Sequence, residues 1–330
     1  MKPILQVENL RKTFKVPGSS EQRLIAVDDV SFNLNAGETL GLVGESGCGK
    51  STTGKTILNL LKADSGRVLF DDVDLLQLSS RQLKPYRREL QMIFQDPFSS
   101  LNPRMTVGDI LSEPLKIHRL ADKKNMYDRV VQLLEQVGLS AEHYHRYPHE
   151  FSGGQRQRVG IARTLAVEPK LIVADEPVSA LDLSIQAQIL NLLRDIQQRY
   201  NLSYLFIAHD LSVIEHISDR VAVMYLGRIV EMTTSDQLYQ SPRHPYTEIL
   251  LNAIPVPVPK QRKQSLPLSG EVPSPINPPS GCHFHPRCPY AQEICHIERP
   301  ILINQTENHL AACHFSDQVG RYLNATETPA

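Results

Sequence analysis

This sequence of 330 residues lacks a strong net charge, a membrane-spanning apolar run and a signal peptide, three features that indicate a protein class directly. Its formal net charge is −1, so charge gives no argument for nucleic acid or an anionic membrane as the main partner. No apolar run approaches the roughly 18 residues that span a bilayer, so work at a membrane would require docking onto an embedded protein. The N-terminal stretch MKPILQVENLRKTF lacks the apolar core of a signal peptide, and we therefore expect a reducing compartment.

Cysteine is scarce and unevenly placed. Four of the five cysteines fall in the last fifty residues, with gaps of five, six and seventeen residues, and these are Cys282, Cys288, Cys295 and Cys313. Clustered thiols in a reducing compartment favour a metal site over disulfides. The gaps fit structural zinc poorly, because zinc prefers closely spaced pairs, whereas iron–sulfur clusters accept varied spacing and a proline after a ligand. Spacing alone leaves iron–sulfur, zinc and unligated buried thiols open.

The order of apolar runs predicts an α/β fold. The runs ETLGLVG, LIVAD and YLFIAHD are typical of short buried strands, and NMYDRVVQLLEQVGL has helical spacing. Such alternation indicates a parallel core sheet. We expect a mainly helical subdomain over about 98–165. The proline-rich segment 255–279 predicts an extended connector, so we place a main domain at 1–253 and a connector with a small cysteine-rich module at 254–330.

The stretch GLVGESGCGKST predicts a phosphate-binding loop between a strand and a helix, KSTTGKTILNLL. Loop amides and the helix N-terminus suit a β-phosphate. Lys50 adds a positive charge for the β- and γ-phosphates, and the Ser51 hydroxyl is a ligand for Mg²⁺. We expect Cys48 to stand apart from the four tail thiols. The predicted loop contacts are Gly44, Glu45, Ser46, Gly47, Cys48, Gly49, Lys50, Ser51 and Thr52.

Two acids follow the predicted strand LIVAD. Asp175 ends the strand and is placed to hold Mg²⁺ through water. Glu176 comes next and is placed to accept a proton from an attacking water. The alternative is an ordinary acidic loop, which the phosphate loop upstream disfavours.

A second anion site is predicted at FSGGQ. Ser152, Gly153, Gly154 and Gln155 open a predicted helix, so a hydroxyl, two glycines and a helix N-terminus come together. One chain would then carry two phosphate-binding surfaces that do not easily reach the same γ-phosphate. A second cassette is therefore implied, with each nucleotide between the loop of one and the SGGQ of the other. The alternative is a plain glycine-containing helix cap.

The order of these motifs resembles the ATP-binding subunit of an ABC transporter: GESGCGKS, IFQDP, FSGGQ, LIVADEP, SALD and IAHD. The resemblance implies a P-loop ATPase with a parallel core sheet, antiparallel N-terminal strands and a helical subdomain. It implies that Phe14 stacks on adenine, and that Gln95 senses Mg²⁺ and the attacking water and couples to membrane subunits. Asp182 would lie at a dimer interface. His209 would hold the γ-phosphate, and Glu176 would be the catalytic carboxylate.

Each of these roles has a simpler alternative. Phe14 would be a core residue, Gln95 a turn cap, and His209 a satisfied polar residue at a strand end. Asp182 would cap the helix that starts near Ser184.

Longer segments resemble the oligopeptide and dipeptide importers and their nickel- and glutathione-type relatives. These segments are FQDPFSSLNPRMTVGDILSEPL, RHPYTEILLNAIP and LSGEVPSPINPPSGCHFHPRCP. The resemblance implies ATP, Mg²⁺ and a [4Fe–4S] cluster on the four tail cysteines, with Zn²⁺ as the alternative. It also implies a second homologous ATPase, two membrane subunits, an external peptide-binding protein and no nucleic acid. The chain would work at the cytoplasmic face of the inner membrane as a peripheral subunit.

Two other classes remain as alternatives. Cassettes of DNA repair and translation usually carry a long coiled-coil insertion or two cassettes in one chain, and this sequence has neither. A redox enzyme built around the tail would need a substrate pocket that nothing in the sequence provides.

Overall fold

The computed structural model describes residues 2–19, 21–96, 100–254 and 270–320. They form two compact units. Unit 1 comprises Met1–Pro3, Leu34–Glu38 and Gln77–Ile207, and unit 2 comprises Ile4–Asn33, Thr39–Leu76 and Ala208–Ala330.

Unit 2 contains two groups of hydrogen-bonded strands. Its strands are β1 (Pro3–Lys15), β2 (Arg23–Asn35), β3 (Thr39–Val43), β4 (Ser65–Phe70), β5 (Val73–Asp74), β9 (Arg220–Tyr225), β10 (Arg228–Thr234), β11 (Ile303–Thr306) and β12 (His309–Ala311). One group has the order β2-β1-β4-β5, in which β1 and β4 are antiparallel, as predicted for the N-terminal strands. The other has the order β11-β12-β10-β9-β3, in which β3 and β9 are parallel.

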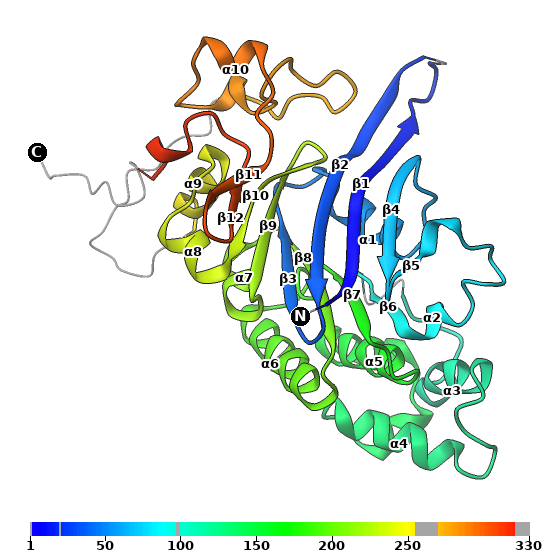
Figure 1. Ribbon diagram of the computed structural model, residues 1–330. Helices are drawn as coiled ribbons and strands as arrows, with labels where there is room; N and C mark the ends of the chain where they lie inside the picture. Colours follow the sequence, from blue (N-terminus) through cyan, green and yellow to red (C-terminus); the bar gives the residue numbers. More distant parts are fainter. Residues whose placement is uncertain (1, 20, 97–99, 255–269, 321–330) are drawn as a thin grey trace, which may run out of the picture. The chain divides into compact units, whose positions relative to one another are not determined.

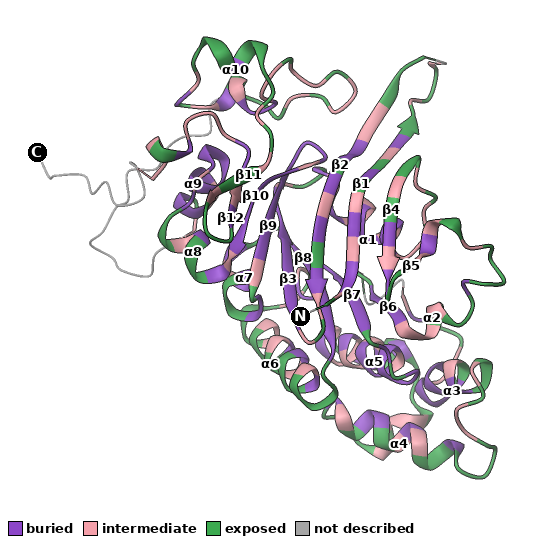
Figure 2. Ribbon diagram, in the orientation of Figure 1, coloured by how far each residue is buried: buried purple, intermediate pink, exposed green. Residues whose placement is uncertain are grey.

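Burial follows the apolar runs of the sequence. All five residues of β3 are buried, and so are most residues of β9 and β10, which appear as purple arrows in Figure 2. The helices of unit 2 are short and can be followed in Figure 1: α1 (Lys50–Ile57), α7 (Leu211–Ile217), α8 (Ser235–Gln240), α9 (Pro245–Asn252) and α10 (Glu293–Ile297), with 3₁₀ turns at Leu75–Gln77, His285–Arg287 and Ser316–Gln318.

Unit 1 contains three parallel strands in the order β8-β7-β6, which confirms the predicted parallel core. These strands are β6 (Leu90–Ile93), β7 (Leu171–Asp175) and β8 (Ser203–Ala208). The helices are α2 (Tyr86–Glu89), α3 (Val107–Ile117), α4 (Met126–Gln136), α5 (Gly153–Leu165) and α6 (Leu183–Tyr200), with 3₁₀ turns at Ala141–His145 and Pro148–Glu150. Helix α6 is amphipathic: Ile189, Leu193 and Ile196 share one buried face, while its other faces are largely exposed.

The predicted helical subdomain corresponds to α3, α4 and α5, all within the expected range of 98–165. Its first residues, 98 and 99, lie outside the described residues. The α/β class with a helical subdomain is therefore confirmed.

The tail takes part in the sheet of unit 2. Strand β12 pairs antiparallel with β10, and β11 pairs antiparallel with β12. Most of the predicted connector, residues 255–269, lies outside the described residues, and the boundary after 253 stays a prediction. The described tail residues share a compact unit with β9 and β10.

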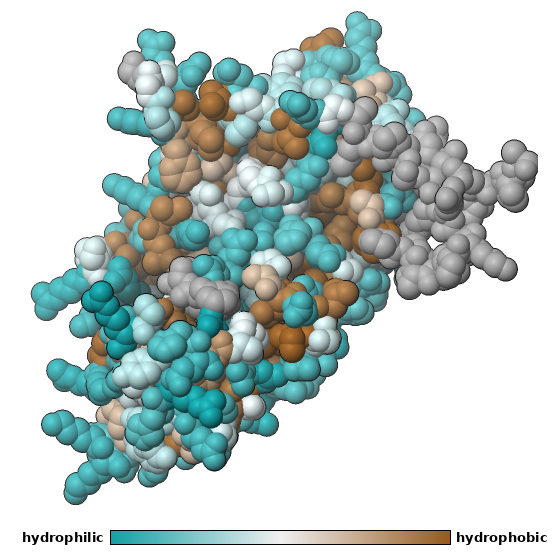
Figure 3. Space-filling model, turned by 180° about the vertical axis from the view of Figure 1, so that it is seen from behind, coloured by the Kyte–Doolittle hydropathy of each residue, from teal (hydrophilic) through white to brown (hydrophobic). Residues whose placement is uncertain are grey.

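None of the helices in the described part of the chain has both the length and the apolar character needed to cross a bilayer. The face of the molecule drawn in Figure 3 carries hydrophobic residues in separate patches among hydrophilic ones.

Candidate nucleotide site and thiol tail

The predicted phosphate loop joins β3 to α1 within unit 2. Gly49 has φ +108°, and a Cβ there would lie 1.9 Å from the carbonyl oxygen of Ala26. Gly44 has φ +153°, and a Cβ there would lie 2.1 Å from the carbonyl oxygen of Met224. Both positions therefore require glycine on backbone and steric grounds. The remaining loop residues predicted to contact nucleotide lie in the same turn or at the start of α1: Ser46, Gly47 and Thr52.

Lys50 points back into this loop. Its buried ammonium donates to the carbonyl oxygens of Gly44, at 2.7 Å, and Glu45, at 2.9 Å. The Lys50 ammonium also lies 3.8 Å from the sulfur of Cys48, whose thiol pKa is raised by burial. Ser51 follows in the first turn of α1. A positive charge and a hydroxyl thus lie where a phosphate and its Mg²⁺ are predicted to bind.

Gln95 and Glu176 come together in unit 1. They follow the ends of the neighbouring parallel strands β6 and β7, and Gln95 Nε2 donates to Glu176 Oε2 at 3.0 Å. Glu176 has φ +46°, an uncommon conformation for glutamate that recurs at functional sites. Asp175 is the last residue of β7 and is buried. The contact of Gln95 with Glu176 favours the predicted catalytic role over a turn cap.

The SGGQ segment begins α5. The Ser152 hydroxyl accepts from the Gln155 amide N–H at 3.3 Å, and the Ser152 N–H donates to Gln155 Oε1 at 3.0 Å. This reciprocal pair of hydrogen bonds is a capping box. Ser152 is also exposed, so a capped helix can still present its N-terminus at the surface. A Cβ on Gly154 would lie 2.5 Å from Ile185 Cγ2, while Gly153 has more room. Of the two glycines, Gly154 is thus the one that allows α6 to approach.

Asp182 occupies the cap position of α6, but its side chain makes no capping hydrogen bond. Asp182 is exposed, and the next residue, Leu183, is 83% exposed. The capping alternative is therefore not supported by a side-chain contact.

His209 and Phe14 belong to unit 2. His209 directly follows β8 on the surface, and the next residue, Asp210, caps α7 through its Oδ1. Phe14 lies in β1 and is 37% exposed, with the Lys12 ammonium 5.2 Å from its ring centroid. Its exposure argues against the core alternative.

All four tail cysteines line one small cavity in unit 2: Cys282, Cys288, Cys295 and Cys313. The Cys282 N–H donates to the carbonyl oxygen of Cys295 at 2.8 Å. Burial raises the pKa of Cys288 and of Cys313 to about 12, and the neighbouring thiols add to the shift. In the described ranges no group of three ligating side chains is arranged to hold a metal ion as it stands. All four cysteines nevertheless line one cavity and influence one another's titration, which is the donor chemistry that a thiolate-bound group needs.

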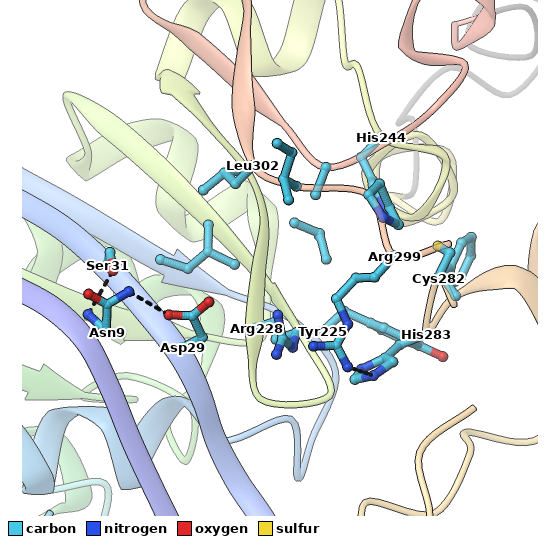
Figure 4. Close-up of a pocket in the computed structure, with 16 residues that line it drawn as sticks. Asn9, Asp29, Ser31, Tyr225, Arg228, His244, Cys282, His283, Arg299 and Leu302 are labelled. Atoms are coloured by element: carbon cyan, nitrogen blue, oxygen red, sulfur yellow. Dashed lines mark hydrogen bonds between the residues drawn. The ribbon is translucent and has the colours of Figure 1, made fainter. Parts of the chain in front are cut away.

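Cys282 also lines a larger cavity of about 500 Å³ (Figure 4). Within it, Arg299 Nη2 donates to His283 Nε2 at 3.2 Å, while Asn9 contacts Asp29 and Ser31 from the N-terminal strands. Burial and the Arg299 charge lower the pKa of His283 to about 4. His283 is therefore neutral near pH 7 and can accept this hydrogen bond beside Cys282.

Two residues that sequence reasoning did not single out reach the phosphate loop. Arg287 lies between two tail cysteines, and its guanidinium donates to both carboxylate oxygens of Glu45, at 2.8 and 3.0 Å. The hydroxyl of Tyr246, in HPYT, accepts from the Glu45 N–H at 2.7 Å. The segments HPYT and HPRCP indicated the oligopeptide and dipeptide importer branch. They gave no information on which residues Tyr246 and Arg287 contact.

Comparison with known proteins identifies the family. The ABC transporter family matches residues 27–179, and the C-terminal region of oligopeptide/dipeptide transporters matches residues 230–295. The "Probable peptide ABC transporter ATP-binding protein y4tS" of Sinorhizobium fredii is 52% identical over 94% of this chain and 89% of its own length. The oligopeptide transport ATP-binding protein AppF of Bacillus subtilis is 51% identical over 94% of this chain and 97% of its own length.

Solved structures show the same fold. The ATP-binding cassette MJ0796, in a dimeric post-hydrolysis state bound to ADP and Pi, superposes with a TM-score of 0.64. It is 28% identical and covers 70% of this chain and 98% of its own. The chain therefore belongs to the ABC transporter family, among the ATP-binding proteins of its oligopeptide and dipeptide transporter branch.

Proposed function

We propose that this chain hydrolyses ATP to power the import of dipeptides or oligopeptides through partner membrane subunits, as a peripheral protein at the cytoplasmic face of the inner membrane. Support comes from the match of residues 230–295 to the C-terminal region of oligopeptide/dipeptide transporters and from the names of the relatives. Nickel-, glutathione- or other small-solute import by the same branch is the alternative, because the solute does not contact the ATPase.

Residues of the phosphate loop and of the strands bind different parts of MgATP. Loop amides and the Lys50 ammonium bind the phosphates, and the exposed ring of Phe14 stacks on adenine. Ser51, Asp175 and Gln95 would hold Mg²⁺, which when bound neutralises phosphate charge.

The hydrogen bond between Gln95 and Glu176 is the main observation that supports ATP hydrolysis by this chain. Glu176 accepts the proton of the attacking water, Gln95 fixes the orientation of that carboxylate, and His209 holds the γ-phosphate and the water.

A second ATPase subunit completes each site. The exposed N-terminus of α5 at Ser152, together with exposed Asp182 and Leu183, presents a surface that suits a second cassette. Gly153, Gly154 and Gln155 complete the anion-binding end of α5. Each nucleotide lies between the phosphate loop of one subunit and the SGGQ of the other, and two membrane subunits and an external peptide-binding protein complete the importer.

The test uses the transporter assembled in proteoliposomes with its membrane subunits. Glu176→Gln should lower the ATP hydrolysis rate by about 10²–10⁴-fold while ATP still binds, because only the proton acceptor is lost. Peptide uptake should stop with it. Glu135→Gln, on the exposed side of α4, is the matched control and should keep both activities. Stimulation of hydrolysis by DNA or ribosomes, but not by the membrane subunits, would instead indicate a repair or translation cassette.

The tail cysteines hold a [4Fe–4S] cluster, with Zn²⁺ as the alternative. Cys282, Cys288, Cys295 and Cys313 supply the four thiolates, and their convergence on one cavity supports this assignment. When bound, such a group would staple the small tail module that carries the four cysteines. Anaerobic purification with iron, sulfide and zinc assays tests the assignment. Stoichiometric zinc without iron would reject the cluster, and neither metal would leave the thiols as buried apolar groups.

A further inference from the structure

We propose that Arg287 and Tyr246 are positioning residues for the phosphate loop, and that Arg287 neutralises the Glu45 carboxylate so that the loop binds nucleotide phosphates. The tail would thereby set the affinity of the loop for ATP. The inference rests on the proposed function only in that the loop binds ATP, and it does not depend on which solute is carried.

Glu45 is held at three of its polar groups. Its N–H donates to the Tyr246 hydroxyl, its carbonyl oxygen accepts from the Lys50 ammonium, and its carboxylate accepts two hydrogen bonds from Arg287. Glu45 therefore also helps to hold the Lys50 ammonium, the group proposed to bind the phosphates. A shift of Glu45 therefore shifts Lys50.

The ion pair between Arg287 and Glu45 is largely shielded from water. The Arg287 side chain is 4% exposed and the Glu45 side chain 23% exposed. The Arg287 guanidinium lies 5.9 Å from the ring centroid of Tyr225. The Glu45 carboxylate holds the pKa of Arg287 above its ordinary value. A bidentate pair in this setting is stronger and more specific than an exposed ion pair.

Electrostatics gives the pair a role beyond packing. Glu45 puts a negative charge into the loop that must bind polyanionic phosphates, and this charge opposes them. The positive charge of the Arg287 guanidinium, hydrogen-bonded to the carboxylate, compensates this negative charge. Without Arg287 the carboxylate would repel the phosphates through a partly buried, weakly screening medium.

The thiol segment fixes where Arg287 lies. Arg287 closes the 3₁₀ turn His285–Arg287, its N–H donates to the carbonyl oxygen of Phe284, and Cys288 follows directly. The Phe284 ring packs against Tyr246 and Tyr225 at centroid distances of 5.5 and 5.2 Å. The segment between the first two tail cysteines thus positions Arg287 and packs against Tyr246, and these are the two residues that hold Glu45.

The decisive experiment measures the Kd for MgATP on the intact chain and the KM and kcat for ATP in the assembled transporter. Arg287→Met should raise Kd and KM about tenfold, because an uncompensated carboxylate then faces the phosphates. The kcat should fall much less, since uniform binding is lost rather than a contact made only in the transition state. Tyr246→Phe should also raise KM, because the Glu45 N–H loses its acceptor.

Rescue separates charge compensation from mere folding. In Glu45→Gln/Arg287→Met the opposing charge is gone, so Kd and KM should return most of the way to the wild-type values. Arg299→Met is the matched control, a tail arginine bonded to His283 rather than to the loop, and it should leave KM unchanged. An Arg287→Met protein that folds with wild-type Kd, or a double variant that binds as weakly as Arg287→Met, overturns the proposal. Absence of peptide uptake by the wild type would reject the proposed solute class without touching this result.

Discussion

His244 is a buried imidazole that must stay neutral. It caps α9, and its Nδ1 accepts the N–H of Tyr246 at 3.1 Å. Burial lowers its pKa from 6.5 to about 3. In the unfolded chain the ring takes up a proton below about its ordinary pKa, whereas in the folded chain it does not. The folded state therefore loses stability as pH falls from 6.5 towards 3, and above 6.5 this residue has little effect.

A pH series on the wild type and His244→Asn tests this. Asparagine also caps helices but does not titrate. From about pH 7.5 to about pH 5 the wild type should lose about 2 kcal/mol of unfolding free energy more than the variant does. Urea unfolding at each pH gives the comparison, and parallel pH profiles for the two proteins would contradict a neutral His244.

Functional residues could be predicted from the sequence where they belong to a motif of known spacing. Residues that come into contact only when the chain folds could not. Glu176 and Gln95 were predicted, and the structure brings them to 3.0 Å. Arg287 was not, because it lies 242 positions from Glu45 and no local pattern relates two residues so far apart.

Two of the glycines of helix α5, Gly154 and Gly160, have opposite surroundings. A Cβ on Gly154 would meet Ile185 of α6 at 2.5 Å, whereas a Cβ on Gly160 would have no neighbour within 4 Å. Close packing of α5 on α6 therefore depends on the first glycine and not on the second.

The two glycine-to-alanine variants make a matched pair. Gly154→Ala should lower the unfolding free energy by about 1–3 kcal/mol, because the β-branched Ile185 has little room to move. Gly160→Ala should raise it by about 0.5–1 kcal/mol through the lower backbone entropy of alanine. Urea unfolding midpoints measure both, and a shift of the same sign in both variants would refute the packing argument.

Element ends were harder to predict than elements. The strand in ETLGLVG is β3, as expected from its unbroken apolar run. The helix predicted over KSTTGKTILNLL ends at Ile57, because Asn59 adopts the left-handed conformation with φ +51°. Asparagine tolerates that conformation well enough to end a helix, so apolar residues beyond it are no guide to helix length.

At the scale of the whole molecule, Glu231 ties the tail to the cassette. This fully buried carboxylate of β10 accepts from the backbone N–H of Arg243 and of His244, at 2.6 and 2.9 Å, and from His309 Nε2 in β12 at 2.7 Å. Its partners come from two separate parts of the chain, the segment before α9 and strand β12. The sequence could not predict this, since the tail reads as a small appended module rather than as part of a sheet.

His309→Ala should lower the unfolding free energy of the full chain by about 1–3 kcal/mol, because a buried carboxylate loses a charge-assisted donor. His216→Ala, at an exposed position of α7, should change it by no more than about 0.5 kcal/mol. Urea titration of both variants checks the difference, and equal midpoints would mean that His309 does not hold the tail.

The hairpin of β11 and β12 also determines how the molecule meets its neighbours in solution. An uncovered β10 would present a row of free N–H and C=O groups, with which another extended chain can pair. Strand β12 takes that row at Glu231 and Met232, and the new outer strand, β11, is only four residues long. Short outer strands are poor templates for intermolecular pairing. The tail thus replaces a long free edge of the sheet with a short one, which offers another chain less backbone to pair with.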